Sequence, residues 1–122
     1  MRPTAYVVDP NPEECRRIER TLAPSVEVVR GLDSAEALLA LLGVREGACL
    51  IVSVEPDEAA TLELVRELRL SGSKIPVIAV GTGAAFRTAT EIARLAFTDF
   101  LERPLTSHKL LAAVERAFGV RK

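Results

Sequence analysis

Short apolar runs alternate with longer amphipathic stretches along the whole chain. Continuous apolar residues bounded by turn residues are typical of strands that are buried on both faces of a parallel sheet. The central run, Cys49–Val52, reaches Ser53 and then gives way to a Glu-Pro-Asp loop. The other predicted strands are Thr4–Val8, Val26–Arg30, Ile75–Val80 and Thr98–Leu101.

After each predicted strand the apolar residues recur at helical spacing, which predicts five helices. The residues expected to be buried are, in chain order, Cys15, Ile18 and Leu22; Ala35, Leu38, Leu39 and Leu42; Thr61, Leu64, Val65 and Leu68; Ala85, Ala89, Ile92 and Ala93; and Leu110, Leu111, Val114 and Phe118. Strands that alternate with helices indicate an α/β fold, because each connection is long enough for a right-handed crossover. We therefore predict a doubly wound, flavodoxin-like sheet of five parallel strands in the order 2-1-3-4-5, with helices on both faces.

This strand order places a crevice outside the carboxyl ends of the first and third strands, where doubly wound folds bind their ligands. Asp9 and Ser53 end these two strands. Asn11 is expected to cap the first helix, with Glu13 and Glu14 favourably placed against the positive end of its dipole.

Composition agrees with one globular domain over residues 1–122, since 48% of the residues are hydrophobic and 27% are charged. Sixteen Lys and Arg against seventeen Asp and Glu give a net charge of −1, which lacks the positive field typical of nucleic-acid-binding domains. No segment approaches the ~18 apolar residues of a membrane span, and the N-terminus has no signal-peptide pattern. We expect a cytoplasmic domain that binds neither nucleic acid nor membrane directly, and that forms the N-terminal part of a longer regulator.

The two cysteines, Cys15 and Cys49, are far apart in the sequence and form neither a CxxC pair nor a metal-binding cluster. One falls on a predicted helix and the other in the central predicted strand. We therefore expect both to be free thiols that act as small buried apolar residues of a reducing compartment.

Several segments resemble the receiver domain of response regulators, and together they cover essentially the whole chain. Tyr6-Val7-Val8-Asp9 resembles the strand that brings acidic metal ligands, and Cys49 to Val54 resembles the strand that bears the phosphoryl-accepting aspartate. Ile75 to Val80 resembles the Pro-Val-Ile strand, and Asp99 to Leu105 resembles the Asp-Phe-Leu-x-Lys-Pro-Phe segment. Between Ile75 and Leu105 the spacing matches the commonest family spacing without a gap.

The chain departs from this family at the positions where the resemblance implies phosphorylation chemistry. Ser53 stands at the acceptor position, and of the two adjacent acidic metal ligands only Asp9 is present, because Pro10 takes the second place. Gly81 stands where the family has a hydroxyl residue, and Arg103 stands where it has a lysine. These five residues define a degenerate phosphorylation pocket.

A neutral hydroxyl is a weak nucleophile without an adjacent base, and it adds no charge to a magnesium site. We therefore predict that aspartyl phosphotransfer is absent, that magnesium binding is weak or absent, and that the domain has no cofactor, catalytic residue or enzymatic activity. Asp9 has two interpretations: a strand-end residue bonded to the following turn, or the partner of Arg103 across the pocket. The second would maintain constitutively an arrangement that metal and phosphate impose in the intact family.

Two further positions follow from the resemblance. Receivers commonly have a cis peptide bond before the proline that corresponds to Pro104, so we expect Arg103-Pro104 to be cis. Phe100 takes the position of the family's rotating aromatic residue. Because Gly81 has no hydroxyl to draw the ring inward, a fixed and partly buried Phe100 is an equally good interpretation.

The leading hypothesis is a pseudo-receiver: a phosphorylation-independent interaction module of a bacterial two-component regulator, with protein partners and an attached output domain. The resemblance implies signalling and homodimerisation through the fourth helix, fifth strand and fifth helix. The charged residues on or near this face are Arg87, Arg94, Asp99, Glu102, Lys109, Glu115 and Arg116. The alternative is a small-ligand or nucleotide-binding domain that uses the crevice at Asp9 and Ser53, although no Gly-rich turn follows the first strand.

Overall fold

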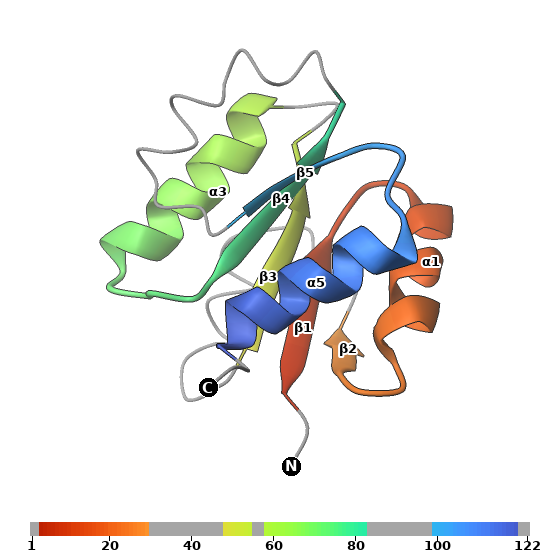
Figure 1. Cartoon of the computed structure of the whole chain (residues 1–122). Helices are drawn as coiled ribbons and strands as arrows, with labels where there is room; N and C mark the ends of the chain where they lie inside the picture. The colour runs from red at the N-terminus through yellow and green to blue at the C-terminus, as the bar shows by residue number, and fades with distance from the viewer. Residues whose placement is uncertain (1–2, 30–47, 55–57, 83–98, 120–122) are drawn as a thin grey trace.

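The computed structural model describes residues 3–29, 48–54, 58–82 and 99–119 (Figure 1). In chain order the elements are β1 (Thr4–Val8), α1 (Pro12–Leu22), β2 (Glu27–Val29), β3 (Ala48–Ser53), α3 (Glu58–Leu70), β4 (Val77–Gly81), β5 (Asp99–Glu102) and α5 (Ser107–Phe118). The predicted second and fourth helices lie outside the described residues. No helix in the described parts of the chain is long and apolar enough to cross a membrane.

The five strands form one parallel sheet in the order β2-β1-β3-β4-β5, which confirms the predicted topology. Every residue of β3 and β4 is buried, as expected for the centre of a sheet that is covered on both faces. The strand boundaries differ slightly from the prediction. β4 begins at Val77 rather than Ile75, since Pro76 has no N–H to donate, although its carbonyl accepts from Leu50 N at 2.9 Å.

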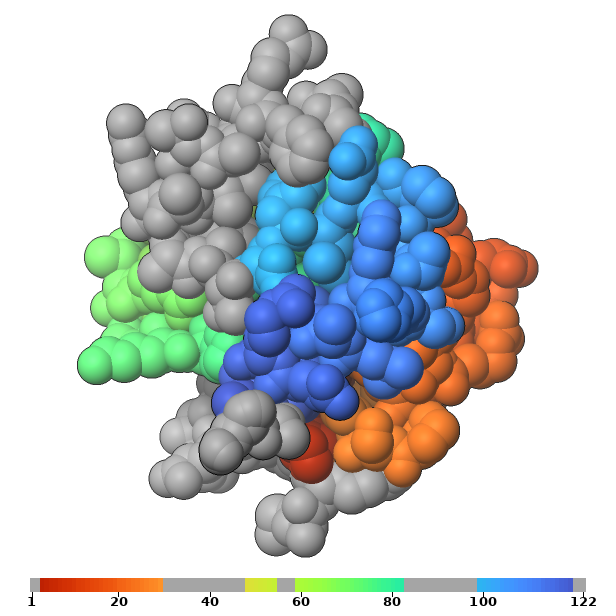
Figure 2. All heavy atoms as spheres, in the orientation of Figure 1, coloured from red at the N-terminus to blue at the C-terminus, as the bar shows by residue number. Residues whose placement is uncertain are grey.

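Helices α1 and α5 cover one face of the sheet, and α3 covers the other (Figure 1). The first face buries Cys15, Ile18 and Leu22 of α1, as predicted from their helical spacing. The second face packs Val65 and Leu68 of α3 against the sheet. Figure 2 shows α5 and α1 as neighbours on the first face.

The prediction for α5 was wrong at one position. Leu111 is exposed, whereas Ala113 is fully buried together with Leu110 and Val114. Leu111 follows Leu110 by one residue, which turns it by about 100° around the helix. The helix buries the stripe that includes Ala113, and the small side chain of this residue allows α5 to lie close to the sheet.

The predicted cap of α1 is confirmed, and the structure adds the two ends of α5. The side chain of Asn11 accepts hydrogen bonds from the backbone N–H of Glu13 at 2.9 Å and of Glu14 at 3.4 Å. α5 has the same kind of cap, since Thr106 Oγ1 accepts from Lys109 N at 3.2 Å. Gly119 ends α5 with a left-handed φ of 63°, a conformation that glycine adopts without steric cost.

Candidate functional site

The neighbouring strands β1 and β3 bring Asp9 and Ser53 to the same edge of the sheet. Val8 of β1 pairs with Val52 of β3, so the next residue of each strand lies at the carboxyl edge. Ser53 is 6% exposed, and its carbonyl accepts a hydrogen bond from Thr61 Oγ1 of α3 at 2.8 Å. This is the edge at which a doubly wound sheet of this strand order has its crevice, and we refer to the place of Asp9 and Ser53 by that name.

The guanidinium of Arg103 enters this crevice from the connection between β5 and α5. Its Nη2 donates to Ser53 Oγ at 3.0 Å and to Asp9 Oδ2 at 3.4 Å. The side chain of Asp9 is 5% exposed and that of Arg103 is 25% exposed, so the pair is largely shielded from water. Arg103 also donates its backbone N–H to the carbonyl of Gly81 at 2.8 Å, and the Arg103-Pro104 bond is cis as expected.

Asp9 satisfies both interpretations that the sequence left open. Its Oδ1 accepts from the backbone N–H of Asn11 at 2.9 Å, while Oδ2 faces Arg103. The carboxylate therefore ends the strand, orders the turn and balances the charge of Arg103. Each oxygen has a separate partner, which is the usual way to bury a charged group.

Glu14 is a residue of the site that sequence reasoning missed. Its Oε2 lies 3.4 Å from Arg103 Nη1, and its side chain is 15% exposed. Its Oε1 lies 3.8 Å from Arg17 Nη1 of the same helix. The sequence contained a hint of this role. Because α1 begins soon after β1 ends, the acids in its first turn must lie near the carboxyl edge of the sheet.

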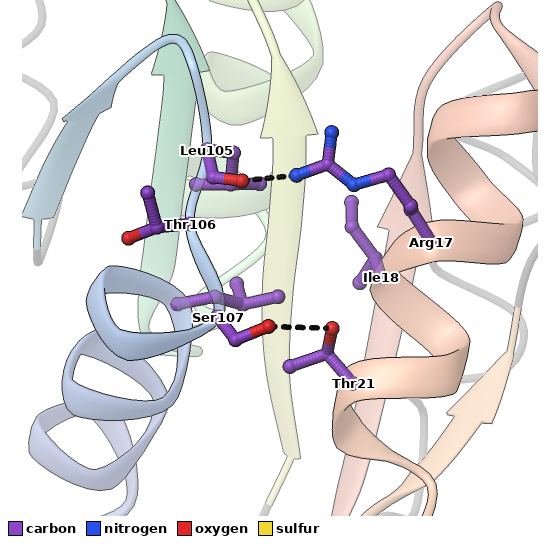
Figure 3. A pocket seen from close by; sticks show the side chains of 7 residues that line it. Arg17, Ile18, Thr21, Leu105, Thr106 and Ser107 are labelled. Atoms are coloured by element: carbon purple, nitrogen blue, oxygen red, sulfur yellow. Dashed lines mark hydrogen bonds between the residues drawn. The ribbon is translucent and has the colours of Figure 1, made fainter.

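Arg17 connects this network to the β5–α5 connection. Its Nη2 donates to the carbonyl of Leu105, as Figure 3 shows. One helical turn further along, the hydroxyls of Thr21 and Ser107 lie 3.4 Å apart. A small, partly open pocket of about 10 Å³, enough for roughly one water molecule, lies between α1 and α5 beside these residues.

The structure also shows the surroundings of Pro10, Gly81 and Phe100. Pro10 is exposed, and Gly81 is buried at the end of β4, next to Glu102 of β5. Phe100 is half-buried and packs against the cluster of Val54 and Ala79. Its role as a rotating aromatic residue stays a prediction.

Most of the described charged residues on the predicted interaction face interact within the chain. Arg116 Nε donates to Asp99 Oδ2 at 3.0 Å, and Lys109 Nζ donates to the Glu102 carbonyl at 3.4 Å. Glu115 is exposed. Arg87 and Arg94 lie outside the described residues. Figure 2 shows β5 and α5 together on one side of the molecule, where this face is expected.

Both cysteines are buried free thiols, as predicted. Cys15 Sγ donates to the Asp9 carbonyl at 3.4 Å, which ties α1 to the end of β1. Burial raises the pKa of the Cys49 thiol to about 12. This thiol is therefore neutral and unreactive in the folded chain at physiological pH.

Comparison with known proteins gives several relatives, although no model of a known protein family matches the chain. The transcriptional regulatory protein FixJ of Azorhizobium caulinodans is 31% identical over 71 residues, which are 58% of this chain and 34% of that protein. The response regulator protein TodT of Pseudomonas putida is 27% identical over 105 residues, which are 86% of this chain and 45% of that protein. The crystal structure of FixJ-N has a TM-score of 0.84 and 25% identity, and the match covers 100% of this chain and 98% of that one. The chain thus spans less than half the length of the curated relatives it matches.

Proposed function

We propose that this chain, which has the fold of a response-regulator receiver domain and is homologous to such domains, is a pseudo-receiver that signals without aspartyl phosphorylation. In this proposal it serves as a protein-interaction module of a bacterial two-component regulator. The observation that carries the proposal is the guanidinium of Arg103, which is hydrogen-bonded to Ser53 and paired with Asp9 in the crevice.

The side chains of the crevice are a poor fit to a divalent metal. Magnesium requires several hard oxygen ligands in near-octahedral geometry. Ser53 offers a neutral hydroxyl, Pro10 offers no side-chain oxygen, and the positive charge of Arg103 already faces the carboxylate of Asp9. A second cation at this place would meet repulsion from the guanidinium, so we derive no step through magnesium.

The same arrangement argues against chemistry at Ser53. Its hydroxyl accepts a hydrogen bond from a permanently charged donor, and the family's route requires a carboxylate as the nucleophile. Arg103 instead supplies a fixed positive charge between the ends of β1 and β3. We propose that this ion pair stands in for the contacts that phosphate and metal make in an intact receiver.

The partners follow from the same proposal. FixJ is named a transcriptional regulatory protein and is longer than this chain. We propose that this chain too is joined to an output domain that acts on transcription, and that it interacts in the cytoplasm with kinase or regulator components. The proposed homodimer face consists of the predicted fourth helix, β5 and α5.

Intact-mass measurement after incubation with acetyl phosphate and magnesium tests the proposal. A receiver domain that has the acceptor aspartate serves as the positive control. We expect no phosphate adduct on this chain, and none on Ser53→Asp, since Pro10 and Gly81 remain unchanged. A phosphate adduct on the unaltered chain would overturn the proposal.

Thermal shift with nucleotides and magnesium separates the pseudo-receiver from the ligand-binding alternative. Arg103 fills the space between Asp9 and Ser53, which supports an interaction module rather than a nucleotide site. We expect no shift of the unfolding temperature. A saturable shift with a nucleotide would favour the alternative.

A further inference from the structure

Helix α1 carries two glutamate–arginine pairs of the same spacing in very different surroundings. Glu13 pairs with Arg16 at 3.4 Å, and Glu14 pairs with Arg17 at 3.8 Å. The side chain of Glu13 is 85% exposed, whereas that of Glu14 is 15% exposed. The first pair is an ordinary surface pair, and the second is part of a larger arrangement.

Glu14 lies between two guanidinium groups. Its Oε2 faces Arg103 Nη1 at 3.4 Å, and its Oε1 faces Arg17 Nη1 at 3.8 Å. Together with Asp9, these residues form a chain of alternating charge in which two carboxylates balance two guanidiniums. Without Glu14, the two guanidiniums would lose the carboxylate that both of them contact, and Arg103 would retain only Asp9 as a charged partner among these residues.

Arg17 extends this network to the surface. Its side chain is about half exposed, and its Nη2 donates to the carbonyl of Leu105, two residues after Arg103 (Figure 3). Arg17 therefore holds the segment from which Arg103 reaches the crevice. The contact between the hydroxyls of Thr21 and Ser107 joins the same two elements one turn further along.

We propose that Glu14 and Arg17 are positioning residues that hold Arg103 in the crevice and couple its position to the outer surface of α1. Glu14 acts on the guanidinium directly, and Arg17 acts by orienting Glu14 and by fixing the β5–α5 connection. This inference rests on the proposed function, in which the ion pair of Arg103 and Asp9 stands in for the contacts of phosphate and metal. Ion pairing at α1 then keeps the guanidinium of Arg103 in that place.

The test compares matched variants of the complete chain by NMR. The guanidinium N–H signals of Arg103 are identified by their loss in Arg103→Lys. We expect Glu14→Gln to shift or broaden these signals. We also expect it to speed hydrogen exchange of the Arg103 amide, which donates to the Gly81 carbonyl, about tenfold or more, because the local opening energy falls. Glu13→Gln, on the same helix, should leave both readouts as in the unaltered chain.

Arg17→Gln and Arg16→Gln form a second matched pair. We expect Arg17→Gln to change the Arg103 signals and the exchange rate, and Arg16→Gln to leave both unchanged. They keep the inference testable if Glu14→Gln does not fold. The inference is overturned if Glu14→Gln and Glu13→Gln give the same Arg103 signals and the same exchange rates. If the glutamine variant of Glu14 does not fold, the same comparison between Arg17→Gln and Arg16→Gln decides. A phosphate adduct after acetyl phosphate would overturn the proposed function and leave the contrast between variants unaffected, so the two failures are distinguishable.

Discussion

Replacement of Arg103 with methionine tests whether the crevice depends on the guanidinium. Methionine retains an unbranched apolar side chain and removes the charge together with the donors to Ser53 Oγ and Asp9 Oδ2. The carboxylates of Asp9 and Glu14 then remain mostly buried, and each loses a cationic partner. The change should therefore lower the free energy of unfolding by far more than the loss of one surface contact would.

The burial of the partners sets the expected size of the effect. Removal of one member of a buried ion pair costs about 3–5 kcal/mol, because the remaining charge is left uncompensated. Arg103 is 25% exposed, so water screens part of its interaction. We expect Arg103→Met to lower the free energy of unfolding by about 2–4 kcal/mol.

The chain offers a control in an exposed arginine–carboxylate pair on α3. Arg66 pairs with Glu63 at 2.6 Å, and the two side chains are 54% and 56% exposed. Exposed ion pairs contribute little, so Arg66→Met should lower the free energy of unfolding by only about 0–1 kcal/mol. The two variants make the same chemical change, and Arg66 lies outside the proposed homodimer face.

Urea unfolding followed by far-UV circular dichroism gives the two free energies, since the chain has no tryptophan for fluorescence. We expect Arg103→Met to lower the free energy of unfolding by at least about 1.5 kcal/mol more than Arg66→Met does. In addition, Asp9→Asn and Arg103→Met should be non-additive when combined, because they disrupt the same contact. Equal costs for the two methionine variants would refute the buried network.

Three other predictions follow from burial and surface charge. Tyr6 has a buried hydroxyl with no hydrogen-bond partner among the described residues, so Tyr6→Phe should be neutral or stabilise by up to about 1 kcal/mol in urea unfolding, and a clear loss would contradict this. Burial raises the pKa of Cys49 from 9.0 to about 12, so the stability that its neutral thiol contributes is complete below pH 9 and is lost as pH rises toward 12. Relative to Cys49→Val, the unaltered chain should lose about 1.4 kcal/mol per pH unit in urea unfolding above pH 9, and parallel pH profiles would contradict this. For the proposed homodimer, sedimentation should show that Asp99→Lys is a monomer while Glu63→Lys, on α3, remains a dimer; an unaltered chain that is monomeric at high concentration would rule the dimer out.

The charged residues illustrate the limit of pattern reasoning at the site. The approach of Asp9 and Ser53 was predictable, because the order of a doubly wound sheet fixes which strand ends are neighbours. The family resemblance pointed to Arg103. Glu14, in contrast, has the same local pattern as Glu13: both are acids in the first turn of α1 with an arginine three residues later. Helical phase separates them, since Glu14 lies four residues before the buried Ile18 and Glu13 lies four residues before the exposed Arg17. The contact of Glu14 with Arg103 depends in addition on the position of the β5–α5 connection.

The amino-acid pattern alone was enough to predict the strand order, the type of each described element, the Asn11 cap and most of the buried residues. These features depend on local propensity and on the spacing of apolar residues, which are readable along the chain. It also determined that Ser53, Pro10 and Gly81 stand where an intact receiver has reactive or metal-binding groups. That contrast defines the proposed function.

The rotation of α5 and the pairing of the charged residues became clear only from the folded structure. Leu111 is exposed and Ala113 is buried because the fit of α5 to the sheet depends on side-chain volumes on both surfaces. The bridge that Glu14 forms between Arg17 and Arg103 depends on contacts across 89 residues of sequence, from 14 to 103. Such charge pairing depends on which distant segments the fold brings together, and the spacing of residues along α1 does not specify that.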